Sequence, residues 1–393
     1  MRSTATRRVS ARRWPAPARC LASSTSRPRT IARRPPCCAS RAVCPLRQAG
    51  RLKRQAVRRN VPPTTRWRNA VSNGHSVDTH NTAHFRHDYA SDQVDLRRLY
   101  EQAKIDQWNA SRDIDWSVPL EGDGGLIADD LVDIHGTRFW QAMSQADRVE
   151  LNQRVTRWRL STLVQGEHGA MLLCSQLVDT VQGQDAKLFQ ATQVADEARH
   201  NEVLQRYLEL RLGGESYALG GNVKEIFDTL LGTSSWHLKT IGLQLVAETF
   251  AVSLFRMLAE SSKDAVLRQV CRRILQDEAR HMGFAMLSLP AIVAEASEAE
   301  HREMEDFAVW ALSRTLSGIF PLGAYQEMGF GKTELDEIKQ FRRERAAGGD
   351  ETAFRKYFRR DLHDGLVRNL RKVGLLSDRI APNLESFGIK LAA

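Results

Sequence analysis

Apolar residues recur at helical spacing along most of the chain from about residue 90 onward, and stretches with strict apolar–polar alternation are absent. Glycine or serine breakers separate the periodic stretches, as at Gly183, Gly213-Gly214 and Ser261-Ser262. The pattern predicts an all-α fold. The expected helices are 91–110, 128–144, 146–182, 185–212, 222–231, 235–261, 264–289, 299–319, 333–346 and 351–374.

Two of these helices contain the same five residues, Asp-Glu-Ala-Arg-His, at 196–200 and at 277–281. In each copy the Glu and the His stand three positions apart, so they share a helix face and could bind one metal ion from adjacent turns. The pairs are Glu197 with His200 and Glu278 with His281. A further Glu-x-x-His that ends at His301 lacks the preceding Asp, and we interpret it as a surface coincidence.

Each copy also has a Glu 30 residues upstream, Glu167 for the first and Glu248 for the second. The middle of each interval contains turn residues, so a helix of about 15 residues, or roughly 22 Å, runs out and the next runs back to the same level. Two such hairpins facing each other would bring four Glu and two His into one layer.

The two upstream Glu residues lie in apolar surroundings, so both carboxylates should be buried. A buried, unpaired carboxylate is costly, and a metal ion would offset that cost. Buried salt bridges to Arg199 and Arg280 are the alternative. Four carboxylates and two imidazoles suit a pair of iron ions, with manganese or a mixed Mn/Fe pair as alternatives, better than zinc or calcium.

The pattern E…DExRH…E…DExRH resembles the ferritin-like di-iron carboxylate superfamily, in its non-haem oxygenase branch. The resemblance implies a ferritin-like four-helix bundle with additional flanking helices, and metal-binding helices within 150–290. It also implies that Asp277 orients His200, that Asp196 orients His281, and that the two arginines of the motifs balance charge. The implied metal ligands are Glu167, Glu197, His200, Glu248, Glu278 and His281, and the implied supporting residues are Asp196, Arg199, Asp277 and Arg280.

Three departures from relatives narrow the branch. Leu204 stands where ribonucleotide reductase small subunits place a radical tyrosine, and Leu243 stands where the ligand-binding oxidases that resemble them have a tyrosine. Ile274 stands where the p-aminobenzoate N-oxygenases carry an extra histidine, which counts against an amine N-oxygenase of that type.

We therefore expect an O₂-dependent oxygenase or oxidase that hydroxylates, desaturates or N-oxygenates a small organic or acyl substrate. The alternative is a ferroxidase, or an iron-handling or oxidative-stress protein. Flavin, nicotinamide and ferredoxin motifs are missing from the sequence, so an external reductase should supply electrons. We also expect a homodimer.

Composition divides the chain in two. Residues 1–70 contain 19 Lys or Arg and no Asp or Glu, so we expect a disordered basic tail over 1–75 and a folded domain over 76–390. Removing those 19 from the 57 basic residues leaves 38 against 47 acidic residues, a net charge of −9, which argues against nucleic-acid binding by the domain. The tail could be a transit peptide, a polyanion binder or, the interpretation we favour, translation from a wrongly chosen start.

Outside the tail the chain has two cysteines, Cys174 and Cys271, which are too few for a disulfide framework. They predict a reducing compartment and a cytoplasmic location, with organelle targeting by the tail as the alternative. We expect no stretch apolar enough to span a membrane.

Overall fold

The structure is a computed structural model that describes residues 75–85, 87–347, 357, 362–389 and 391. Apart from His75, the predicted basic tail lies outside these described residues. Within them the fold is helical without strands, which confirms the all-α prediction. One isolated β-bridge joins Ile127 to Ser262.

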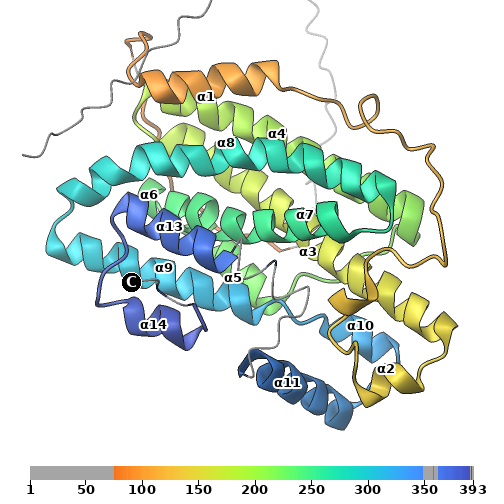
Figure 1. Ribbon diagram of the computed structural model, residues 1–393. Coiled ribbons are helices and arrows are strands. Elements are labelled where there is room, and N and C mark those ends of the chain that lie inside the picture. The colour runs from red at the N-terminus through yellow and green to blue at the C-terminus, as the bar shows by residue number, and fades with distance from the viewer. Residues whose placement is uncertain (1–74, 86, 348–356, 358–361, 390, 392–393) are drawn as a thin grey trace, which may run out of the picture. The chain divides into compact units, whose positions relative to one another are not determined.

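Four long helical rods form the centre of the fold (Figure 1). They are arranged as two antiparallel helical hairpins. In the first hairpin α3 packs along α4, in the second α7 packs along α8, and α4 contacts α8. The rods are α3 (Gln145–Thr180), α4 (Gln184–Leu212), the continuous run α6 (Trp236–Thr240), η2 (Ile241–Ala247) and α7 (Glu248–Ser261), and α8 (Ala265–Glu295).

Local sequence signals set where these helices begin and end. Ser144 and Asp147 form a reciprocal capping box at the start of α3, and the Asp264 side chain accepts from the backbone of Val266 at the start of α8. Gly213 ends α4 in the left-handed conformation, with φ 77°. The two hairpin turns lie at 181–183 and at 262–264, midway in the two 30-residue intervals, as predicted.

Shorter helices surround the bundle (Figure 1). α1 (Val94–Ile105) lies along α4 and α8, α5 (Gly221–Gly232) contacts α3, and α9 (Glu298–Ser317) contacts α5 and η2. The remaining elements are η1 (Asp129–Leu131), α2 (Arg138–Ala142), α10 (Leu322–Glu327), α11 (Lys332–Ala347), α13 (Asp364–Val373) and α14 (Ala381–Ser386).

Several predicted boundaries are wrong. The helix predicted at 91–110 ends at Ile105, and the one predicted at 128–144 is only η1 and α2, interrupted by Gly136 with φ 83°. Of the helix predicted at 351–374, the structure describes α13 and a few residues beside it; the rest lies outside the described residues. α10 and α14 were missed because six residues are too few to show a period.

The expectation about membrane spans also needs correction. By length and composition alone, Trp236–Ser261 is long and apolar enough to cross a membrane, with a mean hydropathy of 1.4 in its most apolar window. Within that window 78% of the residues are buried inside the fold, as in a core helix of the bundle. This rod is apolar because it is surrounded by protein on nearly all sides.

Candidate metal centre

The structure brings all six predicted ligand residues together in the middle of the bundle. Each is buried, with at most 4% of its surface exposed. Their ligand atoms fall into two groups, and within a group all atoms lie within 4.8 Å of one another. The first group is Glu167, Glu197, His200 and Glu278, and the second is Glu197, Glu248 and His281.

The two central glutamates each face both histidines. Glu278 places Oε1 3.2 Å from Nδ1 of His200 and Oε2 3.2 Å from Nδ1 of His281. Glu197 places Oε2 3.4 Å from Nδ1 of His200 and Oε1 3.2 Å from Nδ1 of His281. Both carboxylates could therefore bridge two ions that are held at neighbouring positions.

The two upstream glutamates lie at the outer ends of this arrangement. An oxygen of Glu167 is 3.3 Å from Nδ1 of His200, and an oxygen of Glu248 is 4.0 Å from Nδ1 of His281. Each could serve as a terminal ligand to one ion. The site thus has two similar halves: Glu167 and His200 of the first hairpin form one, and Glu248 and His281 of the second hairpin form the other.

A π-helix sets the position of Glu248. The seven residues Ile241–Ala247 adopt this wider helix directly before it. A π-helical turn holds one more residue than an α-helical turn and so rotates the following side chains around the axis; it is found mostly at functional sites. The sequence pattern, read as one α-helix, gave no sign of this change.

The histidines are oriented by aspartates from the opposite hairpin. Nε2 of His200 lies 3.0 Å from Asp277, and Nε2 of His281 lies 3.3 Å from Asp196. An Nε2–H that donates to a carboxylate leaves the Nδ1 lone pair directed at the glutamates, which is the tautomer that a metal ion requires.

The electrostatics of the cluster favour bound cations. Burial raises the pKa of both Glu167 and Glu248 well above the usual range, and the neighbouring glutamates raise it further. Burial alone would also raise the pKa of Asp277, but its hydrogen bonds to His200 and Arg199 hold that pKa well below the usual range. Without a cation, the outer glutamates would therefore hold protons.

The two motif arginines pair with aspartates instead of glutamates. Arg199 contacts Asp196 at 2.5 Å and Asp277 at 2.9 Å, and Arg280 contacts the same two aspartates. Among the described residues, the ion pairs of these two arginines go to aspartates and not to the four glutamates, which counts against the alternative of Glu–Arg salt bridges. Six carboxylates and two guanidiniums sum to a charge of −4, which two divalent ions would neutralise.

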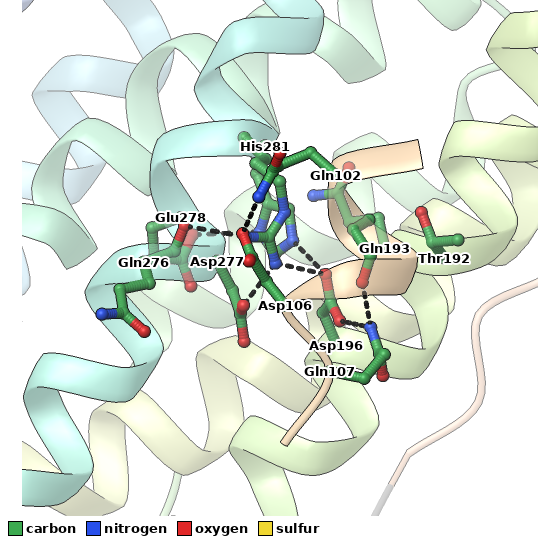
Figure 2. Close-up of polar contacts among 12 residues, drawn as sticks. Gln102, Asp106, Gln107, Thr192, Gln193, Asp196, Gln276, Asp277, Glu278 and His281 are labelled. Carbon is green, nitrogen blue, oxygen red and sulfur yellow. Dashed lines mark hydrogen bonds and ion pairs between the residues drawn. The ribbon is translucent and has the colours of Figure 1, made fainter. Parts of the chain in front are cut away.

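The two residues that follow α1, Asp106 and Gln107, each contact one of the motifs (Figure 2). Asp106 accepts from Arg280 at 3.1 Å, while Gln107 donates to Asp196 at 3.1 Å and accepts from Arg199 at 2.7 Å. The helix predicted over 91–110 gave no sign of these contacts, because the observed helix ends at Ile105 and the following residues leave the helical path.

Trp108 completes this contact. Its indole Nε1 donates to Asp277 at 2.8 Å, and its ring lies parallel to His200 and under the guanidinium of Arg199. The tryptophan therefore fixes the carboxylate that fixes the histidine. Sequence reasoning missed it, since nothing in the local pattern links position 108 to residues 169 positions away.

A buried amide holds two of the glutamates. Gln193 donates from Nε2 to Glu248 at 2.7 Å and to Glu197 at 3.1 Å. Gln244 donates to Oε1 of Gln193 at 2.7 Å and so fixes which end of that amide is the donor. Position 193 is one helical turn before Glu197, but this spacing alone does not distinguish it from other glutamines of the helix.

An apolar cavity reaches the glutamates from between α3, α5 and α7. About 90 Å³ of it is open to the centre of a water molecule, several times what one water needs. Small residues Gly166, Ala170, Ala247 and Ala251 line it beside the metal-site glutamates, with Phe227 and Leu243 among the apolar residues of its wall. The cavity gives a small organic molecule access to the centre.

Other histidines and cysteines of the chain are not among the candidate ligands. His168, the neighbour of Glu167 in sequence, is exposed and lines a separate groove on the outer side of α3. Cys174 and Cys271 are buried free thiols within apolar clusters. His301 of the third Glu-x-x-His lies 3.0 Å from the backbone carbonyl of Gly374 and belongs to neither group of candidate metal ligands.

A helical bundle with two neighbouring carboxylate–histidine groups at one level defines a ferritin-like di-metal protein. The family model described as p-aminobenzoate N-oxygenase AurF matches residues 90–366, more than half of the chain. The chain belongs to this family and is a non-haem di-iron oxygenase, which confirms the superfamily, fold and enzyme class predicted from the sequence.

Solved structures of R2-like ligand-binding oxidases are also similar in fold. One with an aerobically reconstituted Mn/Fe cofactor is 17% identical with a TM-score of 0.43, over 72% of this chain and 92% of that one. Another, after photoconversion, is 18% identical with a TM-score of 0.42, over 72% and 93%. Among curated proteins, no sequence matches the chain.

Family membership corrects the argument drawn from position 274. Ile274 is fully buried in an apolar cluster, so this position adds no histidine to the six residues of the centre. The family match over residues 90–366 therefore holds without a histidine at this position.

Proposed function

We propose that the six clustered residues hold two iron ions. The donor set supports this, because carboxylates and imidazoles are ligands that iron favours. Two buried oxygens, Oε2 of Glu197 and Oε2 of Glu248, have no hydrogen-bond partner among the described residues and would gain one in a cation. Glu167 and His200 would bind one ion, Glu248 and His281 the other, and the two central glutamates both.

The iron pair supplies O₂ binding and electrons for oxidation when it is bound. The chain's own residues do the rest. Asp277 and Asp196 keep both histidines in the metal-binding tautomer, and Gln193 keeps Glu197 and Glu248 from rotating away. The apolar cavity excludes water and holds the substrate beside the glutamates.

We propose further that the substrate is an aryl amine that carries an anionic group, and that the amine nitrogen is oxygenated. The observation that carries this proposal is the composition of the cavity lining. Among the described residues that line the cavity, Arg159 is the one cation, and the metal-site glutamates are its only anions. Arg159 is 4% exposed and donates to the carbonyl of Leu131 at 2.7 Å. Burial lowers the pKa of its guanidinium, and the charge of nearby Asp133 opposes that shift.

Arg159 and Glu167 line the same cavity from one helix, eight residues apart on α3, so their backbone positions are about 12 Å apart along the helix axis. A para-substituted benzene such as p-aminobenzoate, the compound in the family's name, carries its amine and its carboxylate at opposite ends of one ring. Such a molecule could place its amine at the centre and its carboxylate toward Arg159.

Activity of Arg159→Met on p-aminobenzoate and on aniline tests this proposal. Loss of a charged hydrogen bond should raise KM for p-aminobenzoate about 10- to 100-fold and leave aniline unaffected. Arg157→Met, on the same helix but outside the cavity lining, should change neither. Equal effects of Arg159→Met on both amines, or products oxygenated on carbon instead of nitrogen, would refute it.

An iron store is the competing function, and the amount of iron taken up separates the two: a store would sequester many ions per chain, and an oxygenase would bind two.

We also propose that electrons come from an external reductase, that the protein is a homodimer, and that it is cytoplasmic. The missing flavin and nicotinamide motifs support the first, and two buried free thiols support the last.

A further inference from the structure

A row of buried glutamines approaches the metal centre along α4. Gln190, Gln193 and Glu197 stand at positions i, i+3 and i+7, so they lie on one helix face. Gln244 from the π-helix joins the row through its hydrogen bond to Gln193. All three glutamines are completely buried, which is rare for this residue type without full hydrogen bonding.

The row is only partly satisfied by protein atoms. Gln193 uses its amide on Glu197, Glu248 and Gln244. Both the nitrogen and the oxygen of the Gln190 amide have no partner among the described residues, and the same holds for Oε1 of Gln244. Leaving such an atom unsatisfied costs about 1 to 3 kcal/mol, so three of them in one place point to bound water.

A second cavity lies about one helical turn beyond the outer end of the row. Ala186, one turn before Gln190 on the same face, lines it, and about 300 Å³ of it is open to the centres of water molecules. Ser288 lines it too, and its buried hydroxyl has no partner among the described residues. This cavity shares no lining residue with the apolar cavity that reaches the glutamates from α3 and α5.

An oxygenase of this kind needs protons as well as substrate. Oxygenation of an amine, R–NH₂ + O₂ + 2 e⁻ + 2 H⁺ → R–NHOH + H₂O, consumes two protons together with two electrons from the proposed external reductase. One oxygen atom enters the N–O bond and the other leaves as water. The substrate cavity is lined mainly by apolar residues, and its polar lining apart from the glutamates is Arg159 and two threonines.

We propose that Gln190, Gln193 and Gln244 line a water-filled route that carries protons from the second cavity to the metal centre and product water outward. The amides orient the waters and do not titrate themselves. Gln193 delivers the route to the side of the centre between Glu197 and Glu248, while substrate arrives through the other cavity. The inference rests on the proposed function only in requiring that O₂ be reduced.

Gln190→Leu tests the route, because leucine fills a similar volume without polar atoms. The matched control is Gln205→Leu, on the same helix, where the glutamine contacts Glu209 and lies outside the row. The reduced, iron-loaded proteins are mixed with O₂ in H₂O and in D₂O, and reoxidation is followed by stopped-flow absorbance. We expect Gln190→Leu to reoxidise about tenfold more slowly, with a larger solvent isotope effect, and Gln205→Leu to match the unmodified protein.

Iron content and melting temperature separate this role from a structural one. Gln190→Leu should bind two irons and melt no lower than the unmodified protein, because it removes two unsatisfied polar atoms. If it fails to fold, Gln190→Met replaces it. An unchanged rate and isotope effect, or slowing that is accompanied by iron loss, overturns the proposal.

A crystal structure of the iron-loaded protein gives a readout that does not depend on activity. We expect an ordered water within hydrogen-bonding distance of Nε2 or Oε1 of Gln190, and a dry site there overturns the route. Because reoxidation and ordered water are measured without any amine, failure of N-oxygenation leaves these results interpretable, and failure of the route leaves the amine assay unaffected.

Discussion

Two glycines three residues apart on α3 should respond in opposite ways to the same substitution. A Cβ added at Gly169 would lie 2.4, 2.5 and 2.7 Å from three ring carbons of Phe227, closer than side chains approach in proteins. A Cβ added at Gly166 would meet no atom within 4 Å outside its own helix. Phe227 lines both the substrate cavity and the groove on the outer side of α3, so its ring is the wall between them.

The expected magnitudes follow from helix propensity and packing. Replacing glycine by alanine inside a helix gains about 1 kcal/mol, and Gly166→Ala should show that gain in full. Gly169→Ala gains the same amount but must displace a packed ring, an overpacking that costs about 1 to 3 kcal/mol. The two variants should therefore differ by about 1 to 3 kcal/mol in the free energy of unfolding, or roughly 2 to 6 °C in melting temperature.

Thermal and urea unfolding of both variants at equal iron loading measures this difference, since bound metal itself raises the melting temperature. Gly166→Ala should melt above the unmodified protein and Gly169→Ala below Gly166→Ala. Because the new methyl at position 166 enters the cavity, Gly166→Ala should also raise KM for the amine. Equal stabilisation by both substitutions would refute the placement of Phe227 against α3.

Two further predictions concern the centre. Trp108→Phe removes the indole donor to Asp277 and should weaken iron binding about 10-fold. The control is Trp116→Phe, which should leave iron binding unchanged because the indole of Trp116 donates to a backbone carbonyl. Equal iron affinity in the two variants would contradict the role assigned to Trp108. Burial raises the pKa of Glu167 and Glu248, so protons compete with metal as pH falls; iron affinity, measured by chelator competition, should therefore rise from pH 6 to pH 8, and a flat profile would contradict the raised pKa values.

The sequence could indicate the six clustered residues because their arrangement depends on helix geometry alone. Spacing by three fixes the face within each Asp-Glu-Ala-Arg-His motif, and a 30-residue separation fixes the level of Glu167 and Glu248 once a turn lies midway. Both quantities are regular properties of the α-helix. They hold even though the residues that pack around them are unknown.

The supporting residues could not be found in this way. Trp108 reaches Asp277 only because α1 ends at Ile105, and helix ends without a capping side chain leave little trace in sequence. Gln193 is distinguished from other glutamines by a contact with Glu248, 55 positions away. Such contacts depend on tertiary packing, which no local period encodes.

The repeated motif suggests a symmetric centre, but its surroundings are asymmetric. His200 and His281 have equivalent partners, since each faces the aspartate of the other copy. The donors around them differ: Trp108 donates to the aspartate beside His200, and Gln193 donates to the glutamates beside His281. An aromatic donor excludes water where an amide attracts it, so the two ions would bind in unlike environments. On the proposed assignment, the duplicated residues would hold two ions, and residues outside the duplication make the surroundings of those two positions different.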